Sequence, residues 1–172
     1  MYIEFLLLAR DYYRTINRRV FFYEWGVPFI VAFICLFGCI DNFGIFSTFK
    51  DSSINVLGVL LGFSIAVITI LTTGGSKNID EIKKTITDII VNGNKLSLYD
   101  LVLINFTYSV VLEILLIFSC LTIPLLNKVF LFGSNLKLIL YSIMVFVVLH
   151  ILLLTLRNIT DFYFIISKKG RS

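Results

Sequence analysis

Four long runs of apolar residues, separated by short segments that hold most of the charges, constrain this chain more than any other feature. A helix of about twenty apolar residues crosses the hydrocarbon core of a bilayer, whereas a soluble helix keeps a polar face. Hydrophobic residues make up 58% of the 172 residues and charged residues only 15%, which is too little polar surface to cover a soluble core. The sequence therefore predicts an all-α membrane protein, with a single domain over residues 1–172. The expected transmembrane spans are residues 25–40, 54–73, 98–123 and 136–156.

The distribution of Lys and Arg predicts how the chain is oriented. Twelve of the fifteen lie in the N-terminal arm (residues 1–24), between the second and third spans, or in the C-terminal tail (residues 157–172). The two remaining loops hold Lys50, Lys128 and Lys137. Cytoplasmic loops carry an excess of basic residues, so we expect both termini in the cytoplasm.

The N-terminal arm combines basic and aromatic residues. Arg10, Arg14 and Arg18 recur every four residues, which places them on one side of a helix. This pattern is typical of an amphipathic helix that lies in the membrane interface. An ordinary solvated face on a packed cytoplasmic helix is the alternative.

A second amphipathic helix is predicted between the second and third spans, over residues 77–92. Isoleucines repeat there at helical spacing, at positions 79, 82, 86 and 89. We expect this cytoplasmic helix to rest on the membrane, on a partner protein or on another copy of the chain. Ser97 and Asp100 have the spacing of a capping box and predict the start of the third span.

Gly58, Gly62 and Ala66 form a stripe of small residues on the second span. Small side chains let a second helix backbone approach closely inside a membrane. We therefore interpret the stripe as a helix-packing face. The alternative is that it lines a water path.

The third span carries Glu113 near its middle, with Ser109 and Asn105 one and two turns before it. A bare carboxylate costs several kcal/mol in hydrocarbon, so Glu113 must be neutral, paired, or facing protein or water. The three residues form a polar stripe on one side of the helix, which favours an oligomer interface or a pore lining. A hydrogen-bond network that only holds the bundle together is the structural alternative.

His150 lies in the cytoplasmic half of the fourth span. Helix rise places it about two turns from the depth of Glu113, so we expect it closer to Asn105, Tyr108 or Ser109. A satisfied buried histidine is one interpretation, and a proton-sensing or gating residue is the other.

Catalytic and cofactor motifs are missing from the sequence. It has no HExxH, GxSxG or Walker A pattern, and its one histidine has no cysteines at metal-ligand spacing. We therefore expect no enzyme activity, no cofactor, no metal site and no direct binding to nucleic acid.

Three stretches resemble the small four-span membrane effectors of bacterial anti-phage defence operons. They are residues 24–28 (EWGVP) after the aromatic and basic arm, 57–64 (LGVLLGFS) and 78–83 (NIDEIK). The ion-channel component of Hailong systems and the membrane component of Kiwa systems are the two groups it resembles. The resemblance implies the bacterial inner membrane, homo-oligomerisation, and either ion leakage or envelope sensing coupled to a soluble partner. It assigns no functional residue.

Together these features predict a homo-oligomeric ion channel, with a tetramer favoured, whose pore forms between subunits. Four helices are too few to enclose a polar path and also seal it from lipid. Three alternatives stay open: a scaffold or sensor that recruits a soluble protein or binds a signalling ligand on its cytoplasmic face, a phage holin, and a membrane-embedded enzyme.

Overall fold

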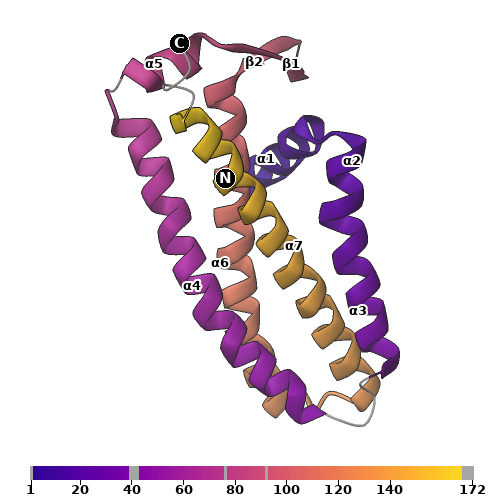
Figure 1. Cartoon of the computed structure of the whole chain (residues 1–172). Coiled ribbons are helices and arrows are strands. Elements are labelled where there is room, and N and C mark those ends of the chain that lie inside the picture. The colour runs from indigo at the N-terminus through magenta and orange to yellow at the C-terminus, as the bar shows by residue number, and fades with distance from the viewer. Residues whose placement is uncertain (1, 39–42, 76, 92, 168–172) are drawn as a thin grey trace.

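The computed structural model describes residues 2–38, 43–75, 77–91 and 93–167, most of them helical (Figure 1). Within these described residues, four helical stretches are long and apolar enough to cross a bilayer, as predicted: Arg18–Gly38, Gly44–Thr73, Leu98–Phe130 and Ser134–Phe164. The elements in chain order are α1 (Tyr2–Thr15), α2 (Arg18–Phe21), the π-helical segment η1 (Phe22–Gly26), α3 (Val27–Gly38), α4 (Phe43–Thr73), α5 (Lys77–Lys84), β1 (Ile86–Val91), β2 (Asn94–Ser97), α6 (Leu98–Phe130) and α7 (Ser134–Ser167).

The helices extend beyond the apolar runs that identified the spans. α4 begins at Phe43, so most of the loop expected before residue 54 is helical. α6 continues through Pro124 to Phe130 and ends at Leu131, whose φ of 47° is left-handed. α7 runs to Ser167, because neither Gly nor Pro interrupts residues 134–167. The expected C-terminal tail is therefore helical over most of its length.

The prediction of a helix over residues 77–92 is wrong after Lys84, where α5 ends. The chain continues there as a two-stranded antiparallel hairpin, in which Ile86 pairs with Ser97 and Val91 with Asn94. Ile86–Val91 is rich in β-branched residues, which favour strands. Gly93, with a φ of 85°, supplies the backbone conformation that a tight hairpin turn needs. A small β hairpin therefore lies beside the helices in the described part of the chain.

The predicted start of the third span is confirmed. Ser97 precedes α6, and its side chain accepts a hydrogen bond from the backbone N–H of Asp100. The Asp100 carboxylate accepts one in return from the backbone N–H of Ser97 at 3.2 Å. This capping box satisfies backbone donors at the point where the hairpin enters the helix.

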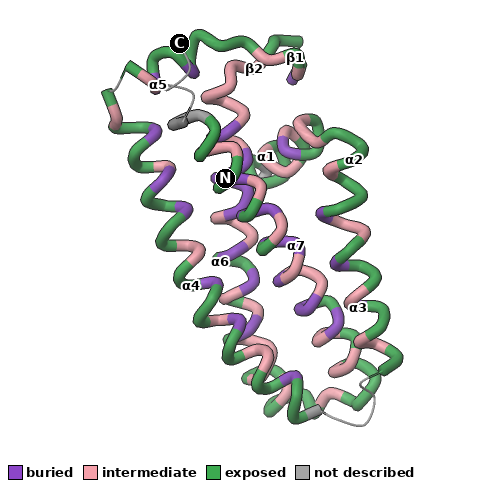
Figure 2. The backbone as a smooth tube through the Cα atoms, in the orientation of Figure 1, coloured by how far each residue is buried: buried purple, intermediate pink, exposed green. Residues whose placement is uncertain are grey.

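The four long helices lie side by side in the order α4, α6, α7, α3 (Figure 1). α6 and α7 are central, α4 packs mainly on α6, and α3 packs mainly on α7. Buried residues of the row face neighbouring helices, while many outer positions are exposed (Figure 2). Such a row has apolar outer faces suited to lipid.

One end of the row carries α1, α5 and the hairpin, together with the C-terminal part of α7 (Figure 1). α1 contacts α6 and β1, and α5 packs against α6 with its buried Ile79 and Ile82. The charge distribution predicts that this end is cytoplasmic.

Candidate functional site

A cluster of hydroxyl groups surrounds the Glu113 carboxyl in the middle of α6. Glu113 has no exposed surface, and its Oε1 accepts a hydrogen bond from Ser109 Oγ at 2.9 Å. Ser64 Oγ, on α4, donates to the same oxygen at 3.5 Å. Ser109 Oγ also lies 3.4 Å from Thr155 Oγ1 on α7. Because Ser109 uses its hydrogen for Glu113, Thr155 is the donor in that pair. Three helices therefore converge on one carboxyl group.

The two carboxyl oxygens of Glu113 differ in their hydrogen bonding. Among the described residues, Glu113 Oε2 is buried and has no hydrogen-bond partner. Buried polar atoms are nearly always paired, so an orphan oxygen calls for an explanation. This oxygen is therefore the unsatisfied position of the cluster within the described part of the chain.

Asn105 belongs to a separate layer of contacts, closer to the α1 end of the row. Asn105 is 4% exposed, and its Oδ1 accepts a hydrogen bond from Thr15 Oγ1 of α1 at 3.4 Å. Asn158 Nδ2 of α7 donates to the backbone carbonyl of Asn105 at 3.3 Å. The predicted stripe is thus a buried face of α6, but its three residues contact other elements of the same chain instead of the outer surface.

His150 is held by the first span and does not contact Glu113. Its Nδ1 lies 2.8 Å from the backbone carbonyl of Glu24. A carbonyl only accepts, so Nδ1 carries the proton and donates. Pro28 explains why this carbonyl is available, because proline lacks the N–H that would reach it in an α-helix. The His150 ring lies 4.7 Å from that of Trp25 and 6.4 Å from that of Tyr108.

A buried ion pair that the sequence did not reveal joins the start of the first span to the fourth span. Glu24 Oε1 lies 3.1 Å from Arg157 Nη1, and Tyr12 Oη donates to Glu24 Oε2 at 2.7 Å. Glu24 lies in η1, where the wider π turn adds one residue to the helix. In the sequence, the only sign of this pair was the opposite charge of Glu24 and Arg157 at the ends of two spans. Two residues so far apart in the sequence cannot be paired from charge alone.

Tyr12 fixes α1 against the row of spans. Its ring has no exposed surface and stacks on Tyr108 of α6 at 3.7 Å between centroids. The Arg157 guanidinium lies 5.7 Å from the centre of the same ring. Burial, and then the neighbouring Glu24 carboxylate, raise the pKa of Tyr12 above its ordinary value. The phenol therefore keeps its proton and donates to Glu24.

The small residues of α4 face away from α6. Gly58, Gly62 and Ala66 are exposed, and a Cβ atom added at either glycine would meet no described atom within 4 Å. The side of α4 that packs on α6 instead carries Leu57, Ser64 and Val67. The stripe is therefore available to a helix outside the chain.

Neither known proteins nor a metal centre identify the site. No family model, curated protein or solved structure matches the chain. No group of three or more His, Cys, Asp or Glu residues within the described ranges could hold a metal ion. The chemistry of the site therefore depends on the carboxyl, hydroxyl and amide groups described above.

Proposed function

We propose that this chain is the subunit of a homo-oligomeric ion channel or pore, with a tetramer favoured. The observation that carries the proposal is Glu113. It is fully buried in the middle of a span, hydroxyl groups are its neighbours, and one oxygen is unpaired among the described residues. Intramembrane carboxyl groups are expensive and usually mark an ion or proton path. A carboxyl with an open coordination position favours cations.

Polar groups extend from Glu113 toward the α1 end of the row. The buried polar residues in this direction are Ser109, Thr155, Asn105 and Asn158. On the other side of Glu113, an apolar cluster that includes Leu116 and Met144 fills the space between the helices. In our proposal the apolar cluster closes the path in this conformation. Spontaneous displacement of α4, an edge helix, would open the path in a fraction of the molecules and expose Glu113.

The outer face of α4 supports assembly of several copies. Gly58, Gly62 and Ala66 leave its backbone accessible to a helix of another subunit. Several copies of the chain arranged in a ring would surround a path that the four helices of one copy cannot enclose. The resemblance of the sequence to anti-phage membrane effectors suggests that such a pore would act in the bacterial inner membrane during infection.

Ion flux through proteoliposomes tests the role of Glu113. Purified wild-type protein should release K⁺ from loaded vesicles, and Glu113→Gln should change the rate several-fold without loss of insertion. Asp51→Asn makes the same chemical change at a side chain that is 67% exposed, and it should leave the flux unchanged. Equal flux in wild type and Glu113→Gln, or no flux from an inserted wild-type protein, would reject the proposal.

A membrane scaffold or sensor is the second candidate, because the α5–hairpin end presents both charge and apolar surface. Lys83 and Lys84 are exposed on α5, and Ile86 and Ile90 are 68% and 58% exposed on β1. These side chains would suit a soluble partner with an acidic rim around an apolar centre. Charge reversal at both lysines should then abolish capture of that partner, and the purified protein should conduct no ions.

A further inference from the structure

α1 covers buried polar groups at one end of the row of helices (Figure 1). Thr15 donates a hydrogen bond to the side chain of Asn105 at 3.4 Å, and Asn105 lies two turns from Glu113 on α6. Tyr12 has no exposed surface and packs in a buried cluster with Tyr108 of α6. α1 therefore lies over the part of α6 where the buried polar residues reach the end of the row.

Polar groups beside α1 lack hydrogen-bond partners. Asn158 donates to the backbone carbonyl of Asn105, but its own Oδ1 is buried and has no partner among the described residues. The guanidinium of Arg157 lies 5.7 Å from the centre of the Tyr12 ring, and its Nε and Nη2 are also buried without a partner in the described part of the chain. Unsatisfied buried polar atoms destabilise the conformation that contains them. Water that entered beneath α1 would satisfy these atoms.

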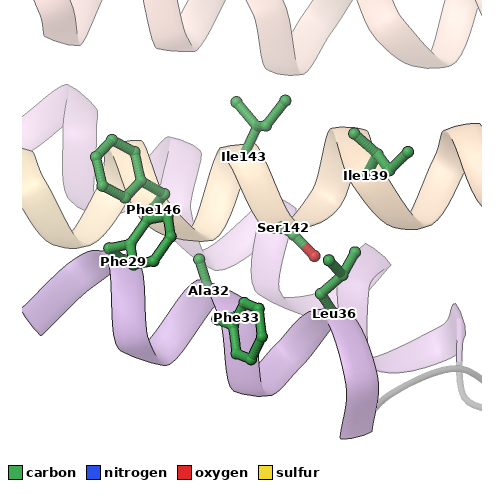
Figure 3. Close-up of a pocket in the computed structure, with 8 residues that line it drawn as sticks. All are labelled: Phe29, Ala32, Phe33, Leu36, Ile139, Ser142, Ile143 and Phe146. Atoms are coloured by element: carbon green, nitrogen blue, oxygen red, sulfur yellow. The ribbon is translucent and has the colours of Figure 1, made fainter.

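The row of spans has contacts that do not involve α1. α1 packs mainly on α6 and β1, whereas α3 and α7 meet around Phe29, Ala32 and Phe146 (Figure 3). Residues 16–17 are not helical, and Asn17 is extended, so a two-residue link separates α1 from the first span. A short link whose backbone angles can change lets the helix before it move as a unit.

We propose that α1 is a lid over the polar path, and that its release from α6 admits water to Asn105, Asn158 and Arg157. This inference rests on the channel proposed above, in which the apolar cluster closes one end of the path and α1 closes the other. Conduction then requires both closures to open in the same molecule. The contacts of Tyr12 and Thr15 contribute to keeping the lid closed in most wild-type molecules.

Cysteine labelling tests the lid without relying on conduction. Asn158→Cys places a thiol at a position that is 1% exposed, so a charged, membrane-impermeant thiosulfonate should modify it slowly in the reconstituted full chain. Addition of Tyr12→Phe, which removes the hydrogen bond to Glu24, should accelerate the modification several-fold, as measured by mass spectrometry of the peptide that contains residue 158. Tyr23→Phe, at a ring that is 71% exposed, should not. Met144→Cys, in the apolar cluster, should stay unreactive and reports unfolding of the spans.

A reversible disulfide tests whether the lid is a gate. Thr15→Cys and Asn105→Cys replace two side chains that are hydrogen-bonded to each other, and oxidation should join them while α1 is docked on α6. In proteoliposomes, the oxidised double variant should release K⁺ several-fold more slowly than the same protein after reduction. Each single variant is the control and should show no such difference.

The two experiments separate failure of the lid from failure of the channel. Labelling at residue 158 that Tyr12→Phe does not accelerate would overturn the lid, and a disulfide that does not form would contradict the docking of Thr15 on Asn105. Equal K⁺ release by the cross-linked and the reduced protein would overturn the role of α1 as a gate. If labelling accelerates but neither wild type nor any variant releases K⁺, the lid stands and the channel proposed above is rejected.

Discussion

The carboxylate of Glu24 and the guanidinium of Arg157 meet at 3.1 Å and join the beginning of the first span to the end of the fourth. The two side chains are 5% and 20% exposed. α3 and α7 already pack along their lengths, so the ion pair and Tyr12 fasten the arm to a helix pair that is present without them. The hydrogen bond from Tyr12 to Glu24 therefore adds to the contacts that hold α1 on α6.

Replacement of Arg157 should destabilise the protein strongly. Arg157→Ala leaves the buried Glu24 carboxylate without its partner, and the expected loss is about 3 kcal/mol. Asp51→Ala removes the exposed member of the pair with Lys50, and the loss should stay below about 1 kcal/mol. Unfolding by denaturing detergent in mixed micelles measures both values. Similar losses in the two variants would contradict a structural role for the Glu24–Arg157 pair.

Tyr12→Phe should loosen α1 without unfolding the spans. The variant keeps the stacked ring but loses the hydrogen bond to Glu24, which corresponds to about 1.5–3 kcal/mol for a bond to a charged group. Hydrogen exchange of the α1 amides should become faster, while exchange in α6 stays slow. Tyr23→Phe, at a ring that is 71% exposed, is the control and should change neither. Unaltered exchange in α1 would show that Tyr12 does not hold the arm.

High pH should release the same arm. The pKa of Tyr12 is raised in the folded protein, so the unfolded chain loses this proton first, near pH 10. The contribution of Tyr12 is therefore complete below about pH 10 and decreases as the pH rises further. Protease cleavage within α1 should increase above that pH in wild type. Tyr12→Phe lacks this titration, and a matching pH-dependent increase in that variant would assign the effect to another group.

The bond between His150 and Glu24 should depend on Pro28. His150→Phe leaves the Glu24 carbonyl unsatisfied and should cost roughly 1–3 kcal/mol. Pro28→Ala restores a backbone N–H that can reach this carbonyl, so the loss from His150→Phe should be smaller in that background. The measurement is a double-mutant cycle of unfolding free energies. Strictly additive losses would refute the link.

A larger side chain on the outer face of α4 should disrupt the association of subunits. Gly62→Leu has open space in the chain itself, so the subunit should fold, but a neighbouring helix could no longer approach closely. Mass photometry of the detergent-purified protein should show fewer oligomers. Val59→Leu, at a position that is 74% exposed, adds less volume beside the stripe and is the matched control. Monomeric wild-type protein would remove the basis of both the assembly and the channel proposal.

Sequence patterns predicted the four spans because a lipid solvent selects long apolar runs. They did not predict where the helices end, since α4 continues past polar residues such as Lys50 and Asp51 that need only reach the interface. The hairpin was missed because isoleucines at positions 79, 82, 86 and 89 fit a helical period, while the β-branched segment after Lys84 favours strands.

The candidate site was predicted in part. Ser109 and Glu113 are neighbours because residues four apart share one helix face. Ser64 and Thr155 come from other helices, and no local pattern specifies which helices are adjacent. The same limit applies to Glu24, Arg157 and Tyr12, whose contacts depend on the order of helices in the row.

That order has a consequence for how the protein is made. The first two spans, α3 and α4, emerge one after the other during synthesis, yet they occupy opposite edges of the finished row. Each finds its main packing partner only after α6 and α7 have entered the bilayer between them. Membrane insertion of the second half of the chain is therefore also the step that assembles the first half.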